Sequence, residues 1–165
     1  MPVAGPEGSH QMADIDTPAP DFELLNQFGE TVRLSQFQGV KPVVLVFFPL
    51  AFTGICTGEL CELRDNFALF QRQGVELLAI SVDSKATLWV YAEQEGYPFS
   101  LLADFWPHGA VAREYGAFQD DRGTADRATF VIDDSGVIRS RFVTESGTAR
   151  SLVAYQGALD ALATV

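Results

Sequence analysis

The sequence predicts an α/β domain with a mixed central sheet flanked by helices. Segments with a strand pattern alternate with segments with a helix pattern through the middle of the chain, an order that favours parallel strands joined by helices. Near the C-terminus, two strand patterns are separated only by Asp134-Ser135-Gly136, a turn sequence typical of an antiparallel hairpin. A length of 165 residues suits one domain with a complete hydrophobic core.

The first half of the domain begins with two short alternating segments, Ala19–Leu24 and Thr31–Leu34, around a turn that contains Gly29. This pattern predicts a β-hairpin. Leu34–Phe37 is expected to form a short helical turn. The next segment, Val43–Phe48, is apolar without interruption, which is typical of a strand buried on both faces of a sheet.

A helix is expected directly after this strand, because apolar residues recur there at helical spacing. Thr53 is well placed to be its N-cap, which makes Cys56 its third residue, and Gly74 marks its end. The apolar stripe consists of Leu60, Leu63, Phe67 and Phe70.

The remaining elements continue the alternation to the C-terminus. Strands are predicted at Val75–Val82, Phe99–Leu102, Thr129–Asp133 and Val137–Phe142, and helices at Ala86–Glu95 (with Ser84 as N-cap), His108–Tyr115 and Ala149–Ala163.

Composition and charge exclude several classes of protein. The 22 acidic and 11 basic side chains give a net charge of −11, which repels nucleic acids and anionic membranes. No apolar run approaches the roughly 20 residues of a membrane span, and no secretory signal is visible. We therefore expect a cytoplasmic protein. Residues 1–12 contain several Gly and Pro residues and no periodicity, so a disordered tail is expected before a domain at 13–165.

The chain has only two cysteines, Cys56 and Cys61, too few for the disulfide framework of a secreted protein. A structural zinc site needs about four ligands, and the only other soft candidates are His10 and His108. No metal or cofactor is expected. In a reducing compartment, such a pair of cysteines indicates redox chemistry.

The position of Cys56 favours a reactive thiol. The unpaired N–H groups and the positive dipole end of a helix N-terminus favour the thiolate over the thiol. On a helical wheel Cys56 falls on the side of the apolar stripe, so we expect it to be half sheltered. The simpler interpretation is that Cys56 is a small buried hydrophobic residue.

The motif Pro49-x-x-x-Thr53-x-x-Cys56 resembles the active-site motif of the peroxiredoxins. The resemblance runs from about Asp14 to the C-terminus. Residues 47–56 and Asp104–Val111 look most like the alkyl hydroperoxide reductase E-type (AhpE) branch. The resemblance implies a thioredoxin-like fold with peroxiredoxin insertions, and a thiol-dependent peroxidase that reduces hydrogen peroxide and organic hydroperoxides.

The resemblance also implies roles for individual residues. Cys56 is the nucleophile, Thr53 donates its hydroxyl to the reacting oxygen, and Pro49 shields the thiolate. The positive charge is expected from Arg127, just before the strand Thr129–Asp133, because a guanidinium stays protonated and offers a rigid fork of donors. Arg64 is the alternative source of this positive charge. However, it follows Cys56 by eight residues, which places it about 12 Å further along the helix axis.

Three aromatic residues are candidates for an apolar mouth that accepts an organic hydroperoxide: Phe48, Phe52 and Trp106. Aromatic side chains at such positions are more often part of the core.

Cys61 departs from the E-type pattern. Cys-x-x-x-x-Cys at this place resembles the PrxQ (bacterioferritin-comigratory-protein) branch, in which the second cysteine resolves the sulfenic acid of the first. Five residues of ideal helix separate the Cα atoms by roughly 8.6 Å, beyond the ~7 Å limit of an unstrained disulfide. The turn that holds Cys56 must therefore unwind before the sulfurs join. If Cys61 does not resolve the Cys56 sulfenic acid, an external thiol must do so.

Two classes of function remain open at this point. The first is a peroxidase that a thioredoxin-, mycoredoxin- or low-molecular-weight-thiol-type reductant regenerates. The resemblance also implies that it is a homodimer. The alternative is a redox-responsive sensor or holdase without turnover. A thioredoxin-like disulfide reductase is disfavoured, because Thr53 stands where that class has its first cysteine.

Overall fold

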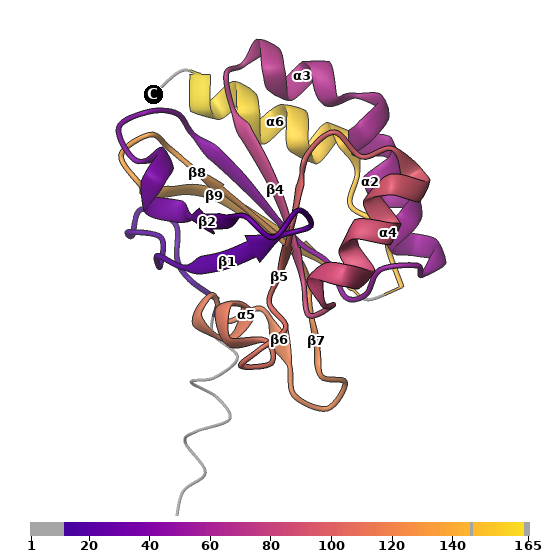
Figure 1. Ribbon diagram of the computed structural model, residues 1–165. Coiled ribbons are helices and arrows are strands. Elements are labelled where there is room, and N and C mark those ends of the chain that lie inside the picture. Colours follow the sequence, from indigo (N-terminus) through magenta and orange to yellow (C-terminus); the bar gives the residue numbers. More distant parts are fainter. Residues whose placement is uncertain (1–11, 146, 164–165) are drawn as a thin grey trace, which may run out of the picture.

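The computed structural model describes residues 12–145 and 147–163, and its centre is a seven-stranded mixed sheet (Figure 1). The predicted tail, 1–12, lies outside the described residues except for Met12. The strand order is β2-β1-β5-β4-β3-β8-β9. The strands are β1 (Glu23–Asn26), β2 (Thr31–Arg33), β3 (Val43–Phe47), β4 (Glu76–Ser81), β5 (Ser100–Ala103), β8 (Arg127–Ile132) and β9 (Ile138–Thr144).

The predicted pairings are confirmed. The hairpin β1–β2 and the C-terminal pair β8–β9 are antiparallel, whereas β3 and β4, and β4 and β5, are parallel. Strand β3 is buried along its whole length, because it lies between β4 and β8 and both of its faces are covered. Since β3 and β8 are antiparallel, the end of β3 and the start of β8 lie at the same edge of the sheet.

The helices are η1 (Leu34–Phe37), α2 (Gly54–Asp65), α3 (Phe67–Arg72), α4 (Lys85–Glu95), α5 (Ala110–Glu114) and α6 (Leu152–Ala163). The continuous helix expected up to Gly74 is wrong, because Asn66 leaves the helical conformation at φ −114° and ψ 20° and separates α2 from α3. The apolar stripe still faces one core, since Leu60, Leu63 and Phe70 are all buried there.

Two hydrophobic clusters cover the two faces of the sheet. One lies between the sheet and helices α2, α3, α4 and α6, and it includes Phe48, Cys56 and Tyr91. The other lies between the sheet, η1 and α5, and its largest members include Phe47 and Tyr115. The layers are visible in Figure 1, where α5 lies away from the other helices. Cys56 therefore belongs to the larger helix layer.

Two expected helix starts differ from the structure, and one small sheet was not expected. Helix α5 begins at Ala110 rather than His108, because Gly109 adopts a left-handed φ of 71° as its N-cap. Helix α6 begins at Leu152 rather than Ala149, because the preceding Arg150 turns into the core. A small two-stranded sheet was not predicted; it consists of β6 (Phe118–Gln119) and β7 (Thr124–Ala125), each only two residues long.

Within the described residues, no helix combines the length and the apolar character needed to cross a membrane.

Candidate active site

The loop between β3 and α2 is fixed from the neighbouring strand and helix. The Ala51 N–H donates to Asp83 Oδ2 over 2.8 Å, and the Ser81 hydroxyl donates to the same oxygen over 2.7 Å. Phe52 adopts a left-handed φ of 64°, which is rare for a bulky residue, and its ring centroid lies 4.8 Å from that of Tyr91. These contacts determine where helix α2 begins.

Cys56 is the third residue of α2, as predicted, and its side chain has no exposed surface. The expectation that it is half sheltered is therefore wrong, because the helix layer closes over it. Its sulfur accepts a hydrogen bond from Arg127 Nη1 at 3.2 Å. Arg127 is the first residue of β8, at the sheet edge where β3 ends, and it is only 4% exposed. A buried guanidinium beside a sulfur stabilises the thiolate electrostatically.

Glu59 joins Arg127 to a second buried arginine. Its Oε1 accepts from Arg127 Nη1 at 2.8 Å and from Arg150 Nη2 at 3.0 Å, and its Oε2 accepts from the Arg150 Nε at 3.0 Å. Burial opposes ionisation of this carboxyl, but its bonds to Arg150 and the nearby charge of Arg127 outweigh burial and lower the pKa of Glu59. Glu59 is therefore a fixed anion at neutral pH.

The network continues behind Arg150. Its Nη1 donates to Thr129 Oγ1 at 3.2 Å, and that hydroxyl is 3.1 Å from the Tyr155 hydroxyl. Burial raises the pKa of Tyr155, so its phenol stays neutral. The backbone N–H of Arg150 also donates to Glu59. Strand β8, helix α2 and the start of α6 are thus joined through side chains buried at their meeting point.

Sequence reasoning missed Arg150 and Asp83. Arg150 was placed inside the last helix, where an arginine is unremarkable. Glu59 was the sequence signal that could have indicated Arg150. Glu59 follows Cys56 by three residues and shares its buried face of α2, and a carboxylate on a buried face needs a cationic partner. No comparable signal identified Asp83.

Thr53 and Pro49 lie in the loop that leads into α2. Thr53 is the N-cap by its backbone, as predicted, but its hydroxyl donates to the Leu50 carbonyl at 2.8 Å rather than accepting from a helix N–H. The expected side-chain cap is therefore absent at this helix start. Thr53 is exposed and Pro49 is partly buried. The segment from Phe52 to Ile55, directly before Cys56, is exposed.

The three candidate aromatic residues differ in exposure. Phe48 is fully buried, Phe52 is 47% exposed, and Trp106 is 82% exposed. Phe48 is therefore a core residue in this conformation, Phe52 lies at the surface over Tyr91, and Trp106 projects from the loop after β5.

Cys61 lies apart from this network, and both cysteines are free thiols. The Cys61 thiol donates to Glu95 Oε1 at 3.4 Å and lies 3.7 Å from the Tyr97 hydroxyl, at the end of α4. Arg64 also faces that end, where its Nη1 donates to the Glu95 carbonyl. Of the two candidate arginines, Arg127 contacts the Cys56 sulfur, and Arg64 contacts residues around Cys61.

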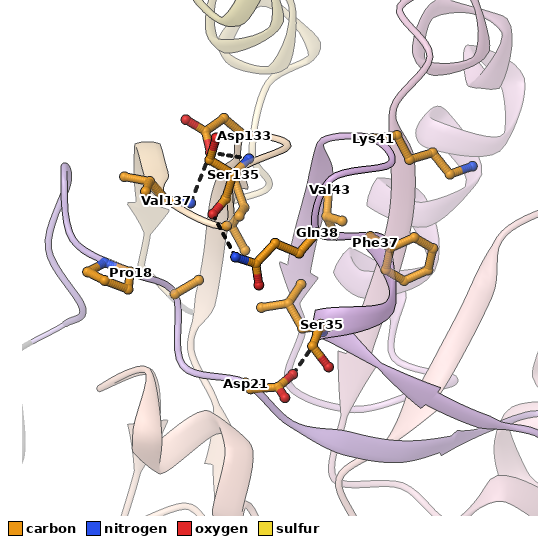
Figure 2. A pocket seen from close by; sticks show the side chains of 14 residues that line it. Pro18, Asp21, Ser35, Phe37, Gln38, Lys41, Val43, Asp133, Ser135 and Val137 are labelled. Carbon is orange, nitrogen blue, oxygen red and sulfur yellow. Dashed lines mark hydrogen bonds between the residues drawn. The ribbon is translucent and has the colours of Figure 1, made fainter.

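A separate cavity of about 270 Å³ lies between the turn after β8 and the segment around η1 (Figure 2). Its polar side chains are already engaged: Asp21 accepts from the Ser35 N–H, and Gln38 donates to the Ser135 carbonyl. No residue of the Cys56 network lines this cavity. In the described part of the chain, no group of three or more His, Cys, Asp or Glu residues is arranged to hold a metal ion.

Comparisons with known proteins agree on one family. The model of the AhpC/TSA family matches residues 15–141. Alkyl hydroperoxide reductase E of Mycobacterium tuberculosis is 47% identical over 151 residues, which cover 92% of this chain and 99% of that protein. Chloroplastic peroxiredoxin Q of Triticum aestivum is 40% identical over 121 residues, 73% of this chain and 54% of that protein. The crystal structure of peroxidoxin BcpB from Mycobacterium tuberculosis has a TM-score of 0.81 at 31% identity, covering 94% of this chain and 99% of that one.

Proposed function

The chain belongs to the AhpC/TSA family of peroxiredoxins, and we propose that the Cys56 sulfur is the nucleophile that attacks the hydroperoxide. The chain is a thiol-dependent peroxidase with a thioredoxin-like fold, as the family match, the named relatives and the structural neighbours establish.

The contact between Arg127 and the Cys56 sulfur is the observation that carries the assignment. In the proposed first step, the Cys56 thiolate attacks one oxygen of the hydroperoxide, the S–O bond forms, the O–O bond breaks, and the released RO⁻ takes a proton. Arg127 stabilises the thiolate and the charge that moves onto the leaving oxygen. Thr53, whose hydroxyl donates to the Leu50 carbonyl in the free protein, turns it to the reacting oxygen when the hydroperoxide binds, and Pro49 shields the sulfur.

Glu59 and Arg150 act through Arg127. A carboxylate held between two buried guanidinium groups fixes the position of Arg127, and its lowered pKa excludes it as a proton donor at neutral pH. We assign both residues a positioning role.

Cys61 is proposed to resolve the Cys56 sulfenic acid as an intramolecular disulfide. The step requires the first turns of α2 to unwind, because the two cysteines are five residues apart in one helix. The first turn of a helix has few intrahelical bonds to lose, and residues 52–55 are exposed. If Cys61 stays free after oxidation, an external thiol resolves Cys56 instead.

Partners and location follow from the same family. We propose hydrogen peroxide and organic hydroperoxides as substrates, with Phe52 and Trp106 at the substrate mouth and Phe48 in the core that also contains Cys56. The proposed reductant is a thioredoxin-, mycoredoxin- or low-molecular-weight-thiol-type donor in the cytoplasm. A homodimer is supported by the exposure of Phe52 and Trp106 beside the helix layer; sedimentation as a monomer at micromolar concentration would contradict it.

The names of the relatives do not support the alternative of a sensor or holdase without turnover. They are called a reductase and peroxiredoxins.

A matched pair of variants tests the assignment. Cys56→Ser is expected to abolish peroxide consumption, because the other thiol of the chain, Cys61, contacts Glu95 and lies apart from Arg127. Cys61→Ser is expected to keep the first oxidation but to accumulate Cys56 as sulfenic and then sulfinic acid at higher peroxide. Stopped-flow peroxide consumption and intact-protein mass spectrometry measure these outcomes.

Wild-type protein treated with one equivalent of peroxide should lose about 2 Da and yield a Cys56–Cys61 cross-linked peptide. Peroxide turnover by Cys56→Ser would refute the first assignment. A stable sulfenic acid in the wild type, with Cys61 free, would refute the second one alone.

A further inference from the structure

Cys61 lies in a small polar cluster that the first oxidation step does not use. Its thiol donates to Glu95 Oε1 at 3.4 Å, and its sulfur is 3.7 Å from the Tyr97 hydroxyl. Cys61 also packs against the larger hydrophobic core. A carboxylate in contact with a thiol in such surroundings is a proton acceptor placed directly on the sulfur.

The Glu95 carboxylate is held by an arginine of the same helix as Cys61. Arg64 Nη1 donates to the Glu95 carbonyl and lies 3.9 Å from Oε1 of its carboxylate. The Glu95 side chain is 22% exposed, so a proton that it accepts can exchange with water. Glu59, in contrast, is 3% exposed and bound to two arginines.

Tyr97 completes the surroundings of the sulfur as a neutral donor. Burial raises the pKa of Tyr97, together with its hydrogen bonds to Tyr91 and Cys61. The phenol therefore keeps its proton and can donate to negative charge on the Cys61 sulfur. Tyr91 in turn lies 2.9 Å from the Thr57 hydroxyl, so the cluster is tied to α2 at a second point.

These contacts also indicate which cysteine moves. Cys61 and Arg64 attach the C-terminal half of α2 to the end of α4. The N-terminal half contains Gly54 and Gly58, which weaken a helix, and its first residues are exposed. The exposed start of α2 is therefore the part expected to unwind, and Cys56 must leave Arg127 as it moves towards Cys61.

We propose that Glu95 is the base that accepts the Cys61 proton when Cys61 attacks the Cys56 sulfenic acid. This inference rests on the proposed resolving role of Cys61 and assigns the residue that activates it.

The step is balanced without a further reagent. The Cys61 sulfur gives an electron pair to the Cys56 sulfur, the S–S bond forms, and the S–O bond of the sulfenic acid breaks. The Cys61 proton passes to Glu95 as the S–S bond forms, because the thiol becomes more acidic as its sulfur shares electrons. The departing hydroxide takes up a proton and leaves as water, and the hydroperoxide consumed earlier is the oxidant.

Glu95→Gln tests the proposal, because it keeps the shape and an accepting oxygen but removes the base. The charged or titratable groups in contact with Cys61 and Glu95 are Arg64 of α2 and Tyr97, with Tyr91 one hydrogen bond further. Glu93→Gln is the matched control, since Glu93 is exposed in the same helix and its substitution removes the same charge. Rapid quenching followed by mass spectrometry, after one equivalent of hydrogen peroxide, measures sulfenic acid and disulfide separately.

Glu95→Gln should slow disulfide formation about tenfold or more at pH 7, with the deficit confined to this second step. The deficit should shrink towards pH 9, where hydroxide in solution replaces the missing base. Glu95→Asp keeps a carboxylate and should give an intermediate rate with the wild-type pH profile. Glu93→Gln should form the disulfide at the wild-type rate.

Two results would overturn the proposal in distinguishable ways. If the wild type forms the disulfide and Glu95→Gln forms it equally fast or faster, the Glu95 assignment is wrong and the resolving role of Cys61 stands. If the wild type forms no Cys56–Cys61 disulfide, the resolving role fails and the role of Glu95 fails with it.

Discussion

At the scale of single residues, the site depends on how charges are paired in a buried place. Arg127 serves two partners at once, the Cys56 sulfur at 3.2 Å and Glu59 at 2.8 Å. Glu59 pairs with both Arg127 and Arg150, so these three buried groups together keep one positive charge beside the Cys56 sulfur. Removal of Arg127 therefore affects both the thiolate and the balance of charge around it.

Arg127→Ala should slow the oxidation of Cys56 by roughly 100- to 1000-fold, since the loss of one donor to a developing oxyanion costs about 2.7–4 kcal/mol. Stopped-flow fluorescence or competition kinetics with limiting peroxide measures this step. Arg127→Lys keeps a cation beside Glu59, and it replaces the alanine variant in this test if that variant folds poorly.

Arg113→Ala is the control for this experiment, because Arg113 is an exposed arginine of α5 paired with Asp120. It should oxidise at the wild-type rate. An unchanged rate in Arg127→Ala, with the fold intact by circular dichroism, would move the role to another cation.

At the scale of elements, helix α2 has two unequal halves. Its N-terminal half follows an exposed loop, contains two glycines and contacts α4 through Thr57, whereas its C-terminal half is bound to α4 through Cys61 and Arg64. The helix ends at Asn66, so unwinding at its start need not disturb α3. This asymmetry suits a helix that opens locally at Cys56.

Gly58→Ala should slow disulfide formation by about two- to fivefold. A glycine inside a helix costs roughly 0.5–1 kcal/mol relative to alanine, and the substitution makes unwinding harder by that amount. A Cβ at Gly58 would meet no atom within 4 Å, so the helix accepts it. The rate of disulfide formation after one equivalent of peroxide measures the effect.

Gly157→Ala provides the matched control in α6, where a Cβ also meets nothing within 4 Å. It should raise overall stability to a similar degree without changing the rate of disulfide formation. Equal slowing in both variants would attribute the effect to global stability and contradict local unwinding of α2.

At the scale of the whole molecule, the sheet brings distant segments of the chain together. Antiparallel pairing of β3 and β8 places Arg127 near the loop that leads to Cys56, although 71 residues separate them. The chain then returns through β9 to place Arg150 against Glu59, 91 residues away in sequence. The β8–β9 turn is held by Asp133, which accepts from the N–H groups of Ser135 and Val137.

Asp133 should make the fold sensitive to acid. Burial opposes its ionisation, but the hydrogen bonds from Val137, Arg139 and Ser135 outweigh burial and lower the pKa of Asp133. A carboxyl with a lowered folded-state pKa contributes stability above its unfolded pKa, about 3.9, and loses it as the pH falls through the folded value. Asp133→Asn keeps an oxygen for the turn but loses the charged partner of Arg139.

Asp133→Asn should therefore lower the free energy of unfolding by about 1 kcal/mol at pH 7, a modest value because Arg139 is partly exposed. The difference from wild type should shrink as the pH falls below about 4. Urea denaturation over this range measures it, and a difference that stays constant with pH would contradict the assignment.

Local patterns in the sequence determined most of the secondary structure and half of the site. An unbroken apolar run identified β3, a turn sequence identified the β8–β9 hairpin, and a motif placed Cys56 in the first turn of a helix. These features depend on periodicity and short spacing, which neighbouring residues encode directly. Arg127, which contacts the Cys56 sulfur, is predicted by the resemblance to the peroxiredoxins and not by local spacing.

Only the tertiary structure decided the rest. The pairing of Glu59 with Arg150, the complete burial of Cys56 and the contact of Cys61 with Glu95 each join segments from 34 to 91 residues apart, or depend on helices that close over the sheet. A charged residue carries no local signal of its partner, because the energy of a buried ion pair depends on which segments the fold brings within a few ångströms. The break at Asn66 was hidden for a similar reason, since the apolar residues on both sides of it face one core.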